Sequence, residues 1–205
     1  ITHFTGDTIL TSPSWSADGK TIFVSRYHPD RVAFELLGVN VASGQSQVIV
    51  PVGDDKSSST VGAEASRDGR WLYYASQVGN RDSEPPAWVI RRRDLGSGAE
   101  ETLVEPPRSY RPDLVLGTFF RPLPSPDGKL LVYATRYGSE LWLRVLDLET
   151  RDDRWLLKLA QHDELEAAAW RDFAPHYAFA PDGRSLVIND GGKFERVSHS
   201  DGAKT

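Results

Sequence analysis

Apolar and polar residues recur in short runs along the chain, and four of these runs directly follow an Asp-Gly pair and one basic residue. They cover 21–27, 71–76, 130–135 and 185–189. The runs are rich in β-branched and aromatic residues, which favour β-strands. Glycine accepts positive φ and an aspartate side chain bonds its own backbone, so Asp-Gly between apolar runs is typical of a hairpin turn. The pattern predicts four β-hairpins.

The four turns share one frame, which makes them an internal repeat. Ser or Ala stands two residues before each aspartate, and Lys or Arg follows each glycine. The turn residues are Asp18 and Gly19, Asp68 and Gly69, Asp127 and Gly128, and Asp182 and Gly183. The aspartates are 50, 59 and 55 residues apart, which is compatible with one unit carrying loops of variable length. Turn chemistry accounts for these aspartates, so we assign them a structural role rather than a metal site.

Each unit continues with further strand-like runs. A third strand is expected at 34–41, 88–94, 141–147 and 193–198, and a fourth at 46–50, 101–104 and 155–159. Strand, turn, strand, loop, strand, turn, strand makes one four-stranded antiparallel blade. We therefore predict an all-β protein, a β-propeller of four repeats with blades at about 6–52, 60–106, 118–160 and 174–205. The segment 163–170 is expected to form a helical turn or two in a loop. Pro is replaced by Ala17 and Arg67 in two of the turns, which we expect to be slightly looser.

The fourth unit lacks a candidate for its last strand, and two explanations stay open. Residues 1–5 could supply that strand and close a four-bladed ring, or they could belong to an earlier blade of a larger ring. We favour the larger ring, because closed four-bladed rings are uncommon. In an open arc the end blades would expose apolar faces and strand edges, which would invite homo-oligomerisation.

Composition narrows the class of protein. Hydrophobic residues make up 39% and charged residues 26%, as in ordinary globular proteins. The net charge of −5 argues against a nucleic-acid partner. No apolar stretch approaches the roughly 18 residues of a membrane span, and no signal peptide is recognisable. There is no cysteine, which excludes disulfides, and no methionine, so we expect a processed chain or a piece of a longer one.

The sequence offers few candidates for chemistry. A hydrolytic metal site needs several convergent imidazoles and carboxylates, yet none of the five histidines forms a His-x-His pair. No Gly-x-Ser-x-Gly nucleophile motif occurs. We predict no catalytic residue, no metal site and no cofactor in this chain. His28 stands in a polar stretch and is expected at the surface. Trp170, Arg171 and His176 lie in and just after a long loop, and they are our candidates for ligand binding.

The run Arg91-Arg92-Arg93 falls in a predicted strand. Successive side chains of a strand point to opposite faces, so two of the three arginines share a side. We interpret the run as a solvated strand with ion-pair partners, with a patch for an anionic ligand as the alternative.

The turn frames resemble those of a known family. Trp15-Ser16-Ala17-Asp18-Gly19-Lys20 and Ser125-Pro126-Asp127-Gly128-Lys129 are similar to the repeats of TolB-like propellers, and the resemblance covers nearly the whole chain. No Trp-Asp dipeptide of the WD40 kind occurs. Five segments are most similar in sequence to the N-terminal propeller of large bacterial amidohydrolases: 89–95, 121–129, 146–150, 166–170 and 177–183.

The resemblance carries the functional hypotheses. It implies a non-catalytic propeller that scaffolds or gates a metal-dependent amidohydrolase domain, in which a divalent metal would reside, and a periplasmic or extracellular location. The partner would be a protein, a peptide or a covalently linked enzyme domain. Alternatives are a stand-alone periplasmic propeller that binds proteins or peptides, the propeller of a prolyl-oligopeptidase-type peptidase, and a propeller lyase.

Overall fold

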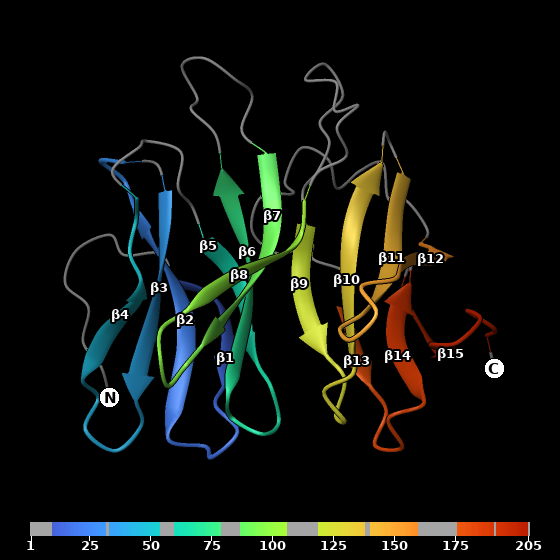
Figure 1. The fold of residues 1–205 in the computed structure, drawn as a ribbon, viewed down its shortest axis with the longest axis horizontal. Coiled ribbons are helices and arrows are strands. Elements are labelled where there is room, and N and C mark those ends of the chain that lie inside the picture. Colours follow the sequence, from blue (N-terminus) through green and yellow to red (C-terminus); the bar gives the residue numbers. More distant parts are fainter. Residues whose placement is uncertain are drawn as a thin grey trace.

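Every regular element of the described residues is a β-strand. The computed structural model describes residues 10–31, 33–53, 60–78, 87–105, 119–137, 140–159, 176–190 and 192–204. The strands form four separate antiparallel sheets, one for each repeat, arranged side by side in an arc (Figure 1). This confirms the prediction of an all-β propeller built from four blades.

Three blades are four-stranded and pair in simple sequence order. Blade 1 contains β1 (Leu10–Trp15), β2 (Thr21–His28), β3 (Ala33–Asn40) and β4 (Ser46–Val50). Blade 2 contains β5 (Thr60–Ala65), β6 (Trp71–Val78), β7 (Ala87–Asp94) and β8 (Glu100–Val104). Blade 3 contains β9 (Phe119–Pro124), β10 (Leu130–Tyr137), β11 (Glu140–Asp147) and β12 (Asp153–Lys158).

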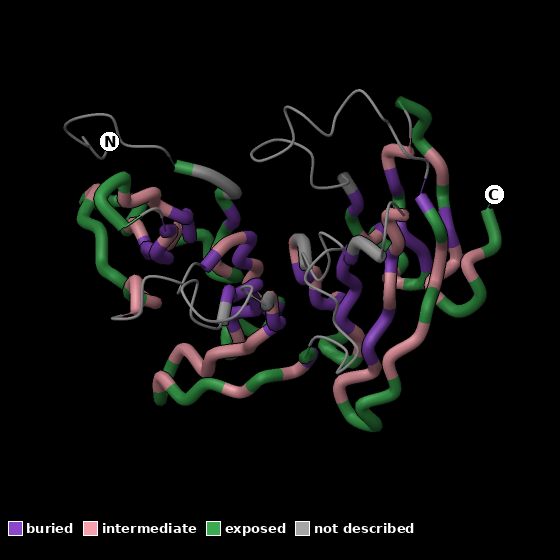
Figure 2. The backbone as a smooth tube through the Cα atoms, turned by 90° about the horizontal axis from the view of Figure 1, so that it is seen from above, coloured by how far each residue is buried: buried purple, intermediate pink, exposed green. Residues whose placement is uncertain are grey.

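Blade 4 contains three named strands, β13 (His176–Phe179), β14 (Ser185–Asp190) and β15 (Lys193–Ser198). Beyond them, Lys204 forms an isolated antiparallel bridge with Val197 of β15, so the C-terminal segment lies where a fourth strand would pair. Residues 1–5, predicted as an alternative fourth strand, and the expected helical turn at 163–170 lie outside the described residues. Blades 1 and 4 stand at opposite ends of the arc (Figures 1 and 2).

The predicted strand ends agree with the structure to within two residues. β6 and β10 each run two residues farther than expected, and β12, expected at 155–159, begins two residues earlier at Asp153. The reason for the early start of β12 is a tight turn before it. Arg151 adopts a φ of 65°, and the Asp147 N–H donates to the Asp152 carbonyl at 2.8 Å, so pairing resumes earlier than the residue pattern indicated.

The expectation of looser turns at Ala17 and Arg67 is wrong. In all four Asp-Gly turns the glycine N–H donates to the carbonyl three residues back, at 2.9–3.0 Å. The four glycines have φ between 67° and 73°. The turns are alike because the glycine and the aspartate define them, so the residue at the Pro position does not matter.

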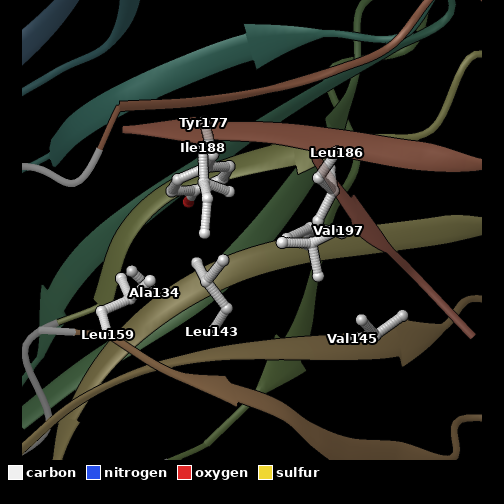
Figure 3. Close-up of a cluster of buried hydrophobic side chains, with 9 residues drawn as sticks. Ala134, Leu143, Val145, Leu159, Tyr177, Leu186, Ile188 and Val197 are labelled. Carbon is white, nitrogen blue, oxygen red and sulfur yellow. The ribbon is translucent and has the colours of Figure 1, made fainter. Parts of the chain in front are cut away.

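The hydrophobic core consists of three clusters of the described residues, each joining two neighbouring blades. One cluster joins blades 1 and 2 through Phe23, Leu36, Leu72 and others, and a second joins blades 2 and 3. Figure 3 shows the third, in which side chains of blades 3 and 4 point toward one another. Buried segments accordingly lie inside the arc and exposed ones at the turns and outer strands (Figure 2). Burial of such faces is the main favourable term that holds the blades together.

Candidate functional site

The Asp-Gly turns of all four blades lie along the same edge of the arc, at the bottom of Figure 1. In the first three, Oδ1 of the aspartate accepts a hydrogen bond from a serine hydroxyl two residues back and from the backbone N–H two residues on. These bonds involve Ser16, Ser66 and Ser125, and Lys20, Arg70 and Lys129. In blade 4, Ala180 stands at the serine position, and Asp182 instead pairs with Arg196.

These bonds keep the turn carboxylates ionised. The serine hydroxyl is the main cause that lowers the pKa of Asp18, Asp68 and Asp127 below its ordinary value, followed by the backbone N–H. For Asp182 the main cause is the N–H of Arg184. In the ranges that the structure describes, no group of three or more histidine and acidic side chains is arranged to hold a metal ion.

The three predicted ligand residues are not brought together by anything that the structure describes. Trp170 and Arg171 lie outside the described residues. His176 is the first residue of β13 and its backbone pairs with Asn189. Ligand binding by these residues therefore stays a prediction.

His28 lies partly at the surface, with 29% of its side chain exposed. His28 ends β2, and its Nε2 lies 3.0 Å from Oε1 of Glu35, whose side chain is 7% exposed. Arg26 pairs with the same carboxylate. β2 runs one residue farther than predicted, so His28 lies on the same face as Arg26, and both reach the buried Glu35. The sequence contained no signal that Glu35 would be buried between two basic residues.

The arginine run of β7 is neutralised by the neighbouring strand. Arg91 and Arg93 share one face and both pair with Glu100, at 3.6 and 2.8 Å, while Arg92 pairs with Glu101 on the opposite face at 2.6 Å. The geometry is that of the ion-paired strand and leaves little free positive charge for an anionic ligand.

Hydrogen bonds of Arg121 connect three blades, and the sequence pattern did not predict them. Arg121 of β9 donates to Glu64 of blade 2 at 2.9 Å and to the Tyr177 carbonyl of blade 4 at 3.2 Å. The Tyr177 hydroxyl donates back to the Arg121 carbonyl. Arg121 has a φ of 38°, which is uncommon for a residue other than glycine, at a bulge where blade 2 has Gly62. The ties on both sides hold it in that conformation.

Both ends of the arc carry exposed apolar side chains. On blade 4, Phe194 is 78% exposed, although its counterparts Leu36, Ile90 and Leu143 are each fully buried against the following blade. Val187 on the same face is also exposed. On blade 1, Trp15 is 59% exposed and Val48 is 45% exposed. The end faces thus resemble the inner faces that join the blades.

A groove of about 720 Å³ lies between blades 1 and 2, at the turn end. It is bordered by the aspartates Asp18 and Asp68 and by the amides of Gln45 and Gln47, and Phe23 and Ile49 contribute apolar lining. Its volume is in the range of small-ligand sites. We call this space the groove.

Comparison with known proteins places the fold. TolB from Acinetobacter baumannii superposes with a TM-score of 0.67 over 98% of this chain and 44% of its own, at 12% identity. The chain has a TolB-like β-propeller fold. A chain of the nidogen–laminin complex matches at 0.66 (11% identity, 96% of this chain, 64% of that chain). A prolyl endopeptidase matches at 0.59 (19% identity, 98% of this chain, 28% of that chain).

These likenesses concern the fold alone, because the identities are low. The chain spans less than two thirds of the length of each of the three structures named above. No protein-family model and no curated protein matches the chain. The described part contains no helix long and apolar enough to cross a membrane.

Proposed function

We propose that this chain is a non-catalytic part of a larger TolB-like propeller that scaffolds or gates a metal-dependent amidohydrolase domain in the same polypeptide. The observation that carries the first half is the exposed face of blade 4. Phe194 occupies a position at which blades 1 to 3 each bury an apolar side chain against the next blade. The occupant that fits this face best is therefore a further blade of the same kind.

The end face of blade 1 supports the same conclusion from the other side. Ile22 of β2 corresponds to Leu72 and Leu131, and both of these pack against the preceding blade. Trp15, beside Ile22 in the sheet, is the largest exposed side chain of this face. Leaving such faces in water is unfavourable by roughly 25 cal/mol per Å² of apolar surface.

The second half of the proposal rests on the sequence resemblance to the propellers of bacterial amidohydrolases. In that arrangement the divalent metal and the hydrolytic residues belong to the linked domain, and the propeller works in the periplasm or outside the cell. Fold likeness alone does not carry an activity.

The test uses the natural polypeptide that contains this sequence. We expect it to contain additional Asp-Gly blades, to bind a divalent metal stoichiometrically and to hydrolyse an amide substrate. A natural polypeptide without further blades contradicts the larger ring. Further blades without metal or amidase activity contradict the enzyme partner and leave a binding propeller.

The isolated chain gives an independent test of the end face. Phe194→Ser should reduce concentration-dependent self-association in analytical ultracentrifugation, because the exposed ring drives contacts that a further blade would otherwise make. Val41→Ser, at another exposed apolar position, is the matched control. A monomeric wild-type chain that binds no hydrophobic dye contradicts the docking role of this face.

One alternative is a peptidase propeller. The prolyl endopeptidase likeness extends over 98% of this chain, as the TolB likeness does, so the propeller of such a peptidase is compatible with the fold. A serine hydrolase domain, with a Gly-x-Ser-x-Gly motif in the natural polypeptide, would distinguish this function from the amidohydrolase partner.

A further inference from the structure

Blades 2 and 3 fill the space between their outer strands with their own side chains. The guanidinium groups of Arg70 and Arg92 both lie against the indole ring of Trp71, at 4.6 and 4.2 Å from its centroid. Nε of Arg92 donates to Glu101 at 2.8 Å, and Arg151 of blade 3 reaches the same carboxylate. We call the space that Trp71, Arg92, Glu101 and Arg151 occupy the filled wedge.

The groove between blades 1 and 2 is the same space with smaller residues. The strand pairings place Thr21, Gly38 and Gln47 of blade 1 where blade 2 has Trp71, Arg92 and Glu101. Gly98 of blade 2 stands where blade 3 has Arg151, in turns closed by equivalent hydrogen bonds. The space between blades 1 and 2 therefore has no counterpart of the Trp71 ring or of the guanidinium groups of Arg92 and Arg151, and an open groove takes their place.

The groove combines negative charge, hydrogen-bond acceptors and an apolar base. Among the described residues that line it, two are aspartates and none is lysine, arginine or histidine. Lys20, next to the groove, lies 3.8 Å from Oδ2 of Asp18 and partly neutralises that carboxylate. Oδ1 of Asp68 is used by Ser66 and Arg70, which leaves its second oxygen for another donor. The amides of Gln45 and Gln47 add acceptors, and Phe23 and Ile49 offer apolar contact.

We propose that the groove binds an arginine side chain presented by a partner peptide. The guanidinium group would lie near Asp18, Asp68 and the Gln47 amide, and the aliphatic stem would lie on Phe23 and Ile49. Arginine fits better than lysine because its planar group offers five donors to several oxygens at once. The ligand thus takes the place of the arginines that the chain itself supplies in the filled wedge. This site is separate from the end faces on which the proposed function rests.

The first experiment is a nuclear magnetic resonance titration of the chain with the blocked peptide acetyl-Gly-Arg-Gly-amide. Its citrulline analogue, which is nearly isosteric and uncharged, serves as the control, and acetyl-Gly-Glu-Gly-amide reverses the charge. We expect weak, saturable binding of the arginine peptide, with shifts at Gln47 and Asp68, and at least several-fold weaker binding of the other two. Equal binding of the arginine and citrulline peptides overturns the proposal.

Variants locate the site. Asp68→Asn keeps the Oδ1 acceptor of the turn but removes the charge, and it should weaken the arginine peptide about two- to five-fold, as for a partly exposed ion pair. Asp127→Asn, the same change in a turn outside the groove, should leave binding unchanged. Gln47→Ala, which leaves the turn hydrogen bonds of Asp18 and Asp68 intact, should also weaken binding. If Asp68→Asn and Asp127→Asn weaken binding equally, the groove is not the site. The proposal also fails if a second copy of the chain occupies the groove and the peptide does not displace it.

Discussion

The filled wedge and the groove have nearly the same backbone and different contents. Both lie between two four-stranded blades whose turns superpose in conformation, with glycine φ values of 68° to 73° in blades 1 to 3. In blade 2 the outer strands carry Trp71, Arg92 and Glu101, and in blade 1 the same positions carry Thr21, Gly38 and Gln47. The comparison teaches that the repeat specifies the sheets and their spacing, whereas a few outer side chains decide whether a space between blades is packed or open to a ligand.

The largest expected effect tests whether the hydrophobic core is packed equally well beneath the filled wedge and beneath the groove. Leu72 and Leu131 are equivalent, and both are fully buried between blades. Leu72→Ala and Leu131→Ala should each lower the free energy of unfolding by about 2–5 kcal/mol, through lost burial and a residual cavity. Urea denaturation measures both.

The two losses should agree to within about 1 kcal/mol if the groove lies outside the core. A much smaller loss for Leu72→Ala would show that the interface of blades 1 and 2 is loosely packed. Val41→Ala, at an exposed apolar position, serves as a control and should change the free energy of unfolding by less than about 0.5 kcal/mol.

Trp71→Thr places the blade 1 residue in the filled wedge. It removes a half-buried ring that packs against the core of blades 2 and 3 and both cation–π contacts. We expect a loss of about 2–4 kcal/mol in the free energy of unfolding, measured by urea denaturation. Trp15→Thr, which removes the same ring from an exposed site, should cost far less. Equal losses would mean that Trp71 contributes no specific packing.

Glu101→Gln gives blade 2 the amide of blade 1 and leaves Arg92 and Arg151 without their carboxylate. The pairs are partly exposed, so a loss of about 0.5–1 kcal/mol in the free energy of unfolding is expected at pH 7. Glu149→Gln, at an exposed site, is the control. Losses of equal size in both variants would show that Glu101 stabilises nothing in particular.

The same variant carries a pH prediction. Burial alone would raise the pKa of Glu101, but the bond from Arg92 and the charges of Arg92 and Arg151 outweigh it, and the pKa lies below its ordinary value of 4.5. The stability that this carboxylate contributes is present above the unfolded pKa and is lost as the pH falls through the folded pKa. The difference between wild type and Glu101→Gln should therefore shrink as the pH is lowered from 6 toward 3.

The smallest effect concerns the second turn of blades 1 and 2, in which Asn40 and Asp94 accept equivalent pairs of backbone hydrogen bonds. The Ser97 N–H and then Arg70 lower the pKa of Asp94 to about 2. A carboxyl carbon titration should give that midpoint, and the contribution of Asp94 to stability should fade as the pH falls from about 4 to 2. In Asp94→Asn this loss of stability with falling pH should be absent, because an asparagine, like Asn40 of blade 1, does not titrate. A midpoint near 3.8 would contradict the role of these bonds.

Local patterns predicted most of the fold. The Asp-Gly pairs defined four hairpins, and the β-branched and aromatic runs after them located the strands to within two residues, since both depend on neighbours in sequence. The arginines of β7 were also assigned correctly to two faces, because a strand alternates. The burial of Glu35 was not predictable, because it depends on which face of blade 1 is covered.

The candidate site could be predicted much less well. Trp170, Arg171 and His176 were chosen because they lie in and just after a predicted long loop, and ligand binding by them remains a prediction. The groove had no signal in the sequence, since Thr21, Gly38 and Gln47 become meaningful beside Gly98, which is far away along the chain. The tie from Arg121 to Glu64 and Tyr177 escaped notice for the same reason, as its three residues belong to three blades.

By itself, the sequence determined the repeat, the turns and the four antiparallel sheets, because these follow from backbone preferences and side-chain alternation over a few residues. The tertiary structure alone decided which faces of the sheets are buried, which end faces stay exposed, and where a space between blades stays open. Those features depend on side-chain volumes and charges from different blades meeting in space, and no local pattern encodes such a meeting.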